Sequence, residues 1–128
     1  MKLLGFLRGM IVTNLLLILL QAVFAGRLIE GDARSLMLHG LTARLLVLCG
    51  LIQLGVAVQL WRKGIAPRGF AFASAGFVVG LVLTFGAGEL HLPALHVPLA
   101  IMLFGGLVRQ MLWTRNIAER PSALETVK

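Results

Sequence analysis

The amino-acid sequence predicts an all-α integral membrane protein, folded as an antiparallel bundle of four transmembrane helices with both termini cytoplasmic. Of its 128 residues, 59% are hydrophobic and only 13% are charged, and the mean hydropathy is +0.94. Soluble domains carry about 25% charged residues. Because a soluble chain of this length has too little interior to bury so much apolar surface, the composition excludes a soluble enzyme and indicates lipid as the solvent.

Four apolar stretches are long enough to cross a bilayer, which takes about 20 mostly apolar residues. They cover residues 4–25, 36–61, 69–87 and 94–113. The polar connections between them are short, which predicts that consecutive helices are antiparallel neighbours. Residues 1–114 are therefore expected to form the transmembrane domain, and residues 115–128 a polar cytoplasmic tail in the form of a short, partly frayed helix.

The first stretch has an alternative interpretation as a secretory signal peptide. Lys2 and Arg8 precede the apolar run, and the sequence AVFAG would allow cleavage after Ala25. The run is long for the apolar region of a signal peptide, however, and it contains Asn14. We therefore favour a retained first helix.

The distribution of Lys and Arg predicts the orientation. The first and third connections hold only Arg27 and Arg34. Nine cations lie at the N-terminus, in the second connection and at the C-terminal end: Lys2, Arg8, Arg62, Lys63, Arg68, Arg109, Arg115, Arg120 and Lys128. An excess of Lys and Arg marks the cytoplasmic side, so both termini should be cytoplasmic. The net charge of +7 is thereby explained by topology, and we expect no nucleic-acid partner.

The second and fourth stretches share a spacing of polar and small residues. Residues 38–53 read LHGLTARLLVLCGLIQ and residues 95–110 read LHVPLAIMLFGGLVRQ. In each, an alanine lies four residues after the histidine and a glutamine lies fourteen after it, within about 40° of the histidine's direction on a helix. The pattern indicates a repeat of two helix pairs, with His39 facing His96 across the bundle at the same depth.

Two neutral imidazoles on opposite sides of a bundle suit axial ligation of haem iron, so His39 and His96 are the candidate ligands. Arg27 and Arg34 are the cations available for the haem propionates. Small residues were expected to make room for the macrocycle: Gly40, Ala43, Gly50, Ala100, Gly105 and Gly106. In the simpler alternative, each histidine lies at the interface or hydrogen-bonds to a loop carbonyl. A further alternative is a copper or zinc site of His39, His91, His96 and Glu89 at the outer surface.

The remaining intramembrane polar residues are expected to hold the helices together. Gln53 and Gln110 should hydrogen-bond between helices. Arg44 should pair with Asn14 or Gln21, or extend outward along its stem. The glycines and alanines of residues 69–80 should allow close helix approach, and the single cysteine, Cys49, excludes an intrachain disulfide.

This arrangement resembles one four-helix half of haem A synthase, as well as small four-helix bacterial b-type membrane cytochromes. That family carries histidine pairs at the outer ends of the second and fourth helices of each half, which match His39 in LMLHG and His96 in PALHVPLA. The resemblance does not extend to the cysteine pair in the first outer loop, or to the acidic residue shortly before the first histidine. It therefore implies binding of haem b rather than haem A synthesis.

The sequence thus predicts a small b-type cytochrome of a bacterial-type inner membrane, with one haem between the second and fourth helices near the outer face. Electron transfer or haem handling is the expected role, rather than a stand-alone enzymatic activity. The expected partners are membrane lipid, a quinol or a redox protein, and a second copy in a homodimer. The alternative is a cofactor-free accessory or assembly subunit of a membrane complex.

Overall fold

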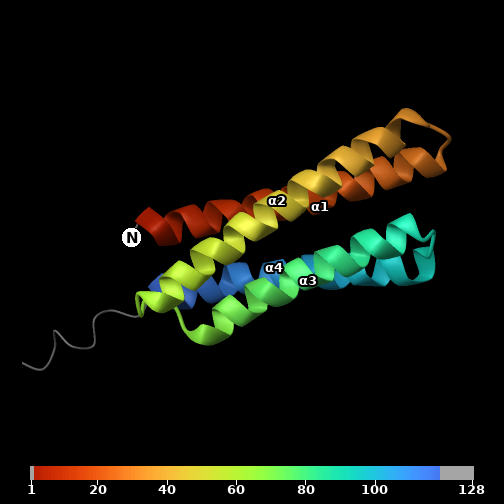
Figure 1. Cartoon of the computed structure of the whole chain (residues 1–128). Coiled ribbons are helices and arrows are strands. Elements are labelled where there is room, and N and C mark those ends of the chain that lie inside the picture. Colours follow the sequence, from red (N-terminus) through yellow and green to blue (C-terminus); the bar gives the residue numbers. More distant parts are fainter. Residues whose placement is uncertain (1, 119–128) are drawn as a thin grey trace, which may run out of the picture.

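The structure, a computed structural model, describes residues 2–118 and contains four α-helices in that range. They are α1 (Lys2–Ile29), α2 (Arg34–Arg62), α3 (Arg68–Glu89) and α4 (Pro93–Ala118). Consecutive helices run in opposite directions, so the chain forms two hairpins, α1–α2 and α3–α4 (Figure 1). Each helix packs against the two beside it, which places α2 and α4 on one diagonal of the bundle and α1 and α3 on the other.

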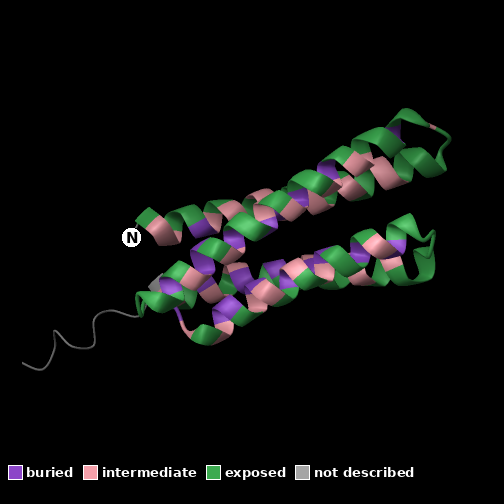
Figure 2. Ribbon diagram, viewed as in Figure 1, coloured by how far each residue is buried: buried purple, intermediate pink, exposed green. Residues whose placement is uncertain are grey.

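All four helices are long and apolar enough to cross a membrane. Each contains a window of mean hydropathy between 1.5 and 2.2, and α3, the shortest, has 22 residues. At a rise of about 1.5 Å per residue, that is about 33 Å, comparable with a hydrocarbon core of about 30 Å. Large apolar side chains such as Leu16, Phe72 and Ile101 are exposed. Exposed residues lie along all four helices (Figure 2), as expected of surfaces that contact lipid.

The helices extend beyond the apolar stretches that the sequence marks. Helix α1 continues to Ile29 and α2 begins at Arg34, so the first connection has four residues rather than ten. The fourth helix similarly continues through 115–118, the start of the expected polar tail, while residues 119–128 lie outside the described residues. Hydropathy marks only the part of a helix inside hydrocarbon, whereas backbone hydrogen bonding continues until a residue ends the helix.

The three connections begin with the same backbone motif. In each, one residue just beyond the helix has a positive φ: Gly31 (95°), Gly64 (70°) and His91 (53°). The N–H of the following residue bonds to a carbonyl five residues back: Asp32 to Arg27, Ile65 to Leu60 and Leu92 to Ala87. This is the Schellman motif, in which glycine is the usual left-handed residue. His91 therefore occupies a glycine position.

The tightly packed core lies toward one end of the bundle. We call the end with the connections 30–33 and 90–92 the tip end, and the opposite end, with residue 2 and the connection 63–67, the base end. The hairpins diverge toward the tip end in Figure 1. The large buried apolar side chains lie from the base end up to the level of Leu46, Leu81 and Leu103. Beyond that level the buried residues of the described chain are all small: Ser35, Thr42, Thr84 and Ala87.

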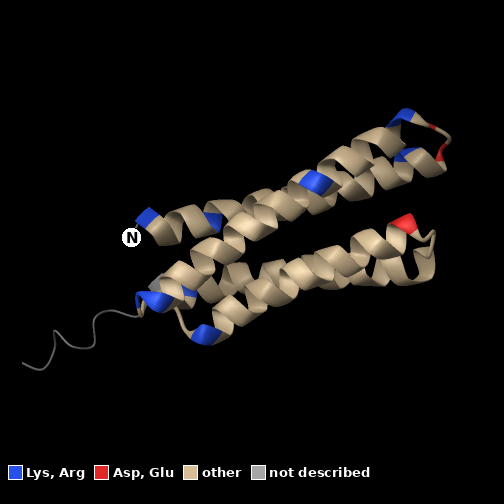
Figure 3. Cartoon of the chain, viewed as in Figure 1, with Lys and Arg blue, Asp and Glu red and all other residues tan. Residues whose placement is uncertain are grey.

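Charges also divide between the two ends (Figure 3). The acidic residues of the described chain are at the tip end: Glu30, Asp32 and Glu89. Most cations lie at the base end, where Arg8 of α1 donates hydrogen bonds to the hydroxyl (3.1 Å) and the carbonyl (2.9 Å) of Thr114 in α4. That contact closes the base end, because α1 and α4 belong to different hairpins.

Candidate functional site

The two histidines that the sequence pairs lie close together across the diagonal of the bundle. The ring of His39 in α2 and the ring of His96 in α4 have their centroids 6.1 Å apart, with their planes tilted by 47°. Both side chains are partly buried, and both lie within two turns of the tip-end start of their helices. The expectation that the two rings meet across the bundle is confirmed.

Each imidazole is held by the partner helix of its own hairpin. The Nδ1 atom of His39 lies 3.2 Å from the carbonyl oxygen of Gln21 in α1, and the Nδ1 atom of His96 lies 2.7 Å from that of Thr84 in α3. A carbonyl oxygen only accepts hydrogen bonds, so Nδ1 is the nitrogen that carries the proton when either ring is neutral. The Nε2 atom of each ring then carries an unshared electron pair.

Small residues leave these two carbonyls accessible. In a helix, the carbonyl of each residue lies next to the residue four positions later in the sequence. That residue is Ala25 for Gln21 and Gly88 for Thr84. A Cβ atom at Gly88 would lie 3.1 Å from Nδ1 and 3.2 Å from Cε1 of His96, so the close approach depends on glycine. The sequence interpretation missed these contacts, whose signal is a small residue four positions after each carbonyl.

In the first hairpin, a second hydrogen bond joins His39 and Gln21. The side-chain amide of Gln21 donates from Nε2 to the carbonyl of His39 at 3.0 Å, so the two residues are bonded in both directions. The Oε1 atom of Gln21 is buried and accepts no hydrogen bond from the described residues. His39 is therefore oriented by one residue through two separate bonds.

The distance between the two ring centres is close to that of two imidazoles bound to one metal ion. Metal–imidazole bonds of about 2.0–2.1 Å, with about 1.1 Å from each nitrogen to its ring centre, give about 6.3 Å between the two ring centres. The observed separation is 6.1 Å. The donor set is two neutral nitrogens, each with its other nitrogen bonded to a carbonyl, which is the usual environment of metal-ligating histidine.

A second polar layer, nearer the base end, joins all four helices. Asn14 of α1 donates to Gln53 of α2 at 2.9 Å, and Gln53 donates to Gln110 of α4 at 2.9 Å. The same oxygen of Gln110 accepts from Ser74 of α3 at 3.1 Å. The expectation that Gln53 and Gln110 bond between helices is therefore confirmed. These buried amides hold the packing and are engaged with one another.

The cations proposed for the propionates lie at the tip end. Arg27 binds Asp32 through Nε (3.0 Å) and Nη2 (2.8 Å), and Arg34 is exposed at the start of α2. Bonds from Arg27 and then from Ser35 hold the pKa of Asp32 below its usual value of 3.8. Arg27 is thus already paired with a carboxylate, whereas the guanidinium of Arg34 lies on the surface.

The small residues expected around a macrocycle divide into two groups. Gly40, Ala43 and Ala100 are partly exposed, close to the two histidines on α2 and α4. Gly50 instead permits close packing, since a Cβ there would lie 2.9 Å from Leu81. Gly106 lies in a groove on the outer surface of α3 and α4, and Gly105 is exposed beside it. The inclusion of Gly50, Gly105 and Gly106 was therefore wrong, because these helices turn their glycines toward different neighbours.

Two glycines confirm the expectation that small residues of 69–80 allow close helix approach. A Cβ at Gly80 would lie 2.7 Å from Leu103, and one at Gly69 would lie 3.2 Å from Trp113. Both therefore allow α4 to approach α3 closely.

Of the two alternatives expected for Arg44, the structure agrees with the outward one, because the side chain is exposed and neither amide pairs with it. Asn14 bonds to Gln53, and Gln21 bonds to His39, as described above. Arg44 is exposed on the outer surface of α2, away from both amides. Its position five residues after His39, about 140° around the helix, accounts for this.

The alternative metal site at the tip end is not formed. Within residues 2–118, no group of three or more His, Cys, Asp or Glu side chains is placed to hold a metal ion. His91 and Glu89 are exposed, and His91 serves as the left-handed residue that ends α3. The copper or zinc cluster that included these residues was therefore wrong for the described chain.

Comparison with family models, with curated proteins and with solved structures found no match to this chain. The class that the fold defines is a four-helix protein whose helices are long and apolar enough to span a membrane, with a pair of facing imidazoles near one end.

Proposed function

We propose that this protein is a small membrane cytochrome of the b type, in which His39 and His96 are the axial ligands of one haem between α2 and α4. The observation that carries the proposal is the pair of imidazoles 6.1 Å apart, each with Nδ1 hydrogen-bonded to a carbonyl. Such bonds fix the ring orientation and leave Nε2 available for a metal.

The packing around the two histidines supports the proposal. Toward the tip end the buried residues of the described chain are small: Ser35, Thr42, Thr84 and Ala87. Gly40, Ala43 and Ala100 lie on the helices that carry the ligands. These residues would line a flat ligand with little side-chain bulk, and the apolar helices would exclude water from it.

The charge distribution supports an orientation with the base end in the cytoplasm. Of the twelve Lys and Arg residues, nine belong to the termini and the second connection, and two belong to the tip-end segments. This asymmetry follows the positive-inside rule for a bacterial-type inner membrane. The histidines would then lie near the outer face, with the exposed Arg34 as the cation for acidic groups there, since Arg27 is already paired with Asp32.

A bound haem supplies a one-electron iron couple. The chain's own residues orient the two histidines, exclude water and set the distance from the haem to the outer surface. A haem near that surface suits electron exchange with a quinol or a redox protein, or haem handling. The resemblance to half of haem A synthase agrees with such a site. A homodimer would bring two of these halves together.

The direct test is an absorption spectrum of the full-length protein, purified in detergent from cells supplied with a haem precursor. We expect a red protein with a Soret band and, after reduction, the sharp bands of a low-spin haem. Carbon monoxide should not change the spectrum, because both axial positions are occupied by imidazole. A protein that stays colourless, even after incubation with haemin, would refute the proposal.

The runner-up is a cofactor-free accessory or assembly subunit. It is favoured by the hydrogen bonds that both histidines and all four members of the amide layer already make within the protein. In that case the histidines only join the helices of each hairpin, and haemin should change neither the spectrum nor the thermal stability.

A further inference from the structure

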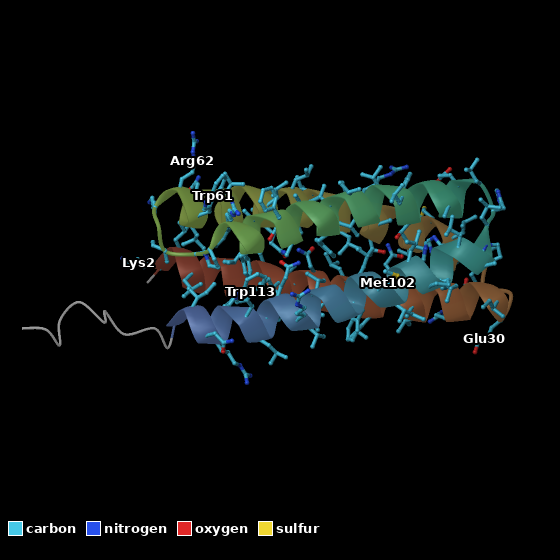
Figure 4. The ribbon with its side chains drawn as sticks, turned by 90° about the horizontal axis from the view of Figure 1, so that it is seen from below. Lys2, Glu30, Trp61, Arg62, Met102 and Trp113 are labelled. Atoms are coloured by element: carbon cyan, nitrogen blue, oxygen red, sulfur yellow. The ribbon has the colours of Figure 1, made fainter. Side chains whose placement is uncertain are left out.

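A groove with a volume of about 280 Å³ lies between α3 and α4 on the outer surface of the bundle. Its floor contains the buried side chains of Phe77, Leu103 and Gln110, and exposed residues such as Met102 line its sides. Figure 4 labels Met102 and Trp113, two of the lining residues of α4. The groove therefore opens toward the surroundings of the bundle, and neither His39 nor His96 lines it.

Glycines keep the groove open. A Cβ atom added at Gly76 or at Gly106 would meet no atom within 4 Å, although both residues line the groove. Gly80 does not widen the groove in the same way, because Leu103 already fills the space beside it. An apolar chain can therefore lie along α4 in the space that larger side chains at Gly76 and Gly106 would occupy.

The base end of the groove is cationic. The guanidinium carbon of Arg109 lies 5.7 Å from the centre of the Trp113 ring, a cation–π contact that holds the cation at the groove. A second hollow, lined by Arg109, Leu112, Trp113 and Asn116, continues from it. The acidic residues of the described chain are at the tip end, so none of them neutralises Arg109.

The dimensions correspond to one lipid chain. From Trp113 to Leu99, the lining residue of α4 nearest the tip end, the helix rises by about 21 Å, more than half of the hydrocarbon thickness of about 30 Å. Tryptophan is typical of the membrane interface, where its ring has both apolar and polar contacts. The groove thus runs from a cation with an interfacial indole into apolar surface, which matches an amphiphile with an anionic head.

We propose that this groove binds an anionic phospholipid of the base-end leaflet, with its phosphate at Arg109 and Asn116 and one acyl chain along Gly106 and Gly76. A bare cation at this depth is costly in hydrocarbon, and a lipid phosphate reaching down to it offsets that cost. A second copy of the chain fits less well, because no acidic residue of the described helices lies at this level to meet Arg109.

The test uses tryptophan fluorescence of the full chain in vesicles. The Trp61→Phe variant, which leaves Trp113 as the single indole, is reconstituted into phosphatidylcholine containing a small fraction of brominated phosphatidylglycerol or brominated phosphatidylcholine. Bromine on the acyl chain quenches a nearby indole. We expect half-maximal quenching at about fivefold lower mole fraction of phosphatidylglycerol, the ratio that one cation gives against an anionic lipid.

Matched variants make the result specific. Arg109→Gln should abolish the preference, whereas Arg115→Gln, an exposed cation outside the groove, should retain it. Gly106→Leu should reduce quenching by phosphatidylglycerol to the phosphatidylcholine value. Gly105→Leu, which also meets open space but does not line the groove, should leave it unchanged.

Three outcomes would overturn the proposal. Equal quenching by both lipids would mean ordinary boundary lipid. Loss of the preference on addition of inorganic phosphate would mean a site for a free anion. Weak quenching by both lipids, relieved when the protein is diluted in the membrane, would mean that a second copy covers the groove. None of these outcomes depends on haem, so a colourless protein would leave the test intact.

Discussion

The imidazole of His39 lies 6.1 Å from the imidazole of His96, although the two residues belong to different hairpins and to helices on opposite corners of the bundle. Their backbones are not in contact, so only the side chains meet at the centre. The pair therefore links the two hairpins toward the tip end, where large buried side chains are missing from the described chain. A metal ion with imidazole ligands would strengthen this link.

The two histidines should be required for haem binding. His39→Ala or His96→Ala should each remove the Soret band from the purified protein, because one remaining imidazole holds iron weakly. Membrane insertion should persist, since the four apolar helices are unchanged. The measurement is the haem-to-protein ratio from the absorption spectrum.

His91→Ala is the matched control, because His91 is exposed in the 90–92 connection and belongs to neither ring pair. It should bind haem like the parent chain. Retention of the full spectrum in both His39→Ala and His96→Ala would refute the ligand assignment, and loss in His91→Ala alone would mean that another pair binds iron.

Gly88 should position His96. In Gly88→Ala the new methyl group would lie 3.1 Å from Nδ1 and 3.2 Å from Cε1 of the ring, so the imidazole must shift by a few tenths of an ångström. Residues that orient a metal-ligating histidine change affinity by about 10- to 100-fold, and we expect about tenfold weaker haem binding. Haemin titration of the apoprotein measures the change.

Gly86→Ala provides the comparison, because a Cβ there would meet no atom within 4 Å and the residue lies on the same helix. Its haem affinity should equal that of the parent chain. If the two variants bound haem equally well, the packing of Gly88 against His96 would have no role in the site.

The amide layer should contribute to stability independently of any cofactor. Gln53→Leu removes the acceptor of Asn14 and a donor to Gln110, and leaves those buried amides with fewer partners. We expect a loss of about 2 kcal/mol in the free energy of unfolding, from lost interhelical bonds and unsatisfied polar groups. Unfolding by a denaturing detergent measures it.

The control is Gln59→Leu, the same substitution at an exposed position of α2. It should change the free energy of unfolding by less than about 0.5 kcal/mol, as surface substitutions usually do. Similar losses in both variants would show that the buried bonds carry no special stability.

The facing of the two histidines and of the two glutamines could be predicted because helical geometry fixes it. Once hydropathy had marked the helices, equal spacing between His39 and Gln53, and between His96 and Gln110, put each pair on one face. In the structure the two histidine rings lie close together, and the two glutamines are hydrogen-bonded to each other. The number of helices and their order followed from apolar length alone.

The contacts of individual glycines could not be predicted in this way. Whether Gly50 or Gly106 borders a cofactor, a neighbouring helix or open surface depends on the rotation and separation of the packed helices, which hydropathy does not determine. Likewise, the sequence leaves two alternatives for Arg44, a partner in Asn14 or Gln21 or an outward side chain, because the faces of the two helices relative to each other are not known from hydropathy.

The connection at 90–92 can be stabilised by a single substitution. His91 has a φ of 53° at the position that glycine occupies in the two other connections. A left-handed conformation costs about 1 kcal/mol for a residue with a Cβ, so His91→Gly should raise the free energy of unfolding by about that amount. Gly64→Ala, at a φ of 70°, should lower it similarly. A loss of stability in His91→Gly would mean that the imidazole makes contacts that outweigh the strain.

Asp32 should make stability depend on pH at the tip end. Its carboxylate accepts hydrogen bonds from Arg27, from Ser35 and from the backbone N–H of Arg34, the first residue of α2. The bond from Arg27 is the main reason that the pKa of Asp32 lies below its usual value of 3.8. Since the folded-state pKa is the lower one, the ionised carboxylate stabilises the folded protein fully at pH values above 3.8, and this contribution is lost as the pH falls through the folded-state pKa.

Thermal unfolding, followed by circular dichroism in detergent at a series of pH values, compares Asp32→Asn with the parent chain. The variant should be less stable at neutral pH, and the difference should shrink below pH 3.8. Glu30→Gln is the control, because Glu30 is an exposed acid in the same connection. Salt should reduce the difference for Asp32→Asn, since Arg27 and Asp32 are both solvent-accessible. If the stability difference between Asp32→Asn and the parent chain persisted unchanged through acid pH, Asp32 would stabilise the fold independently of its charge.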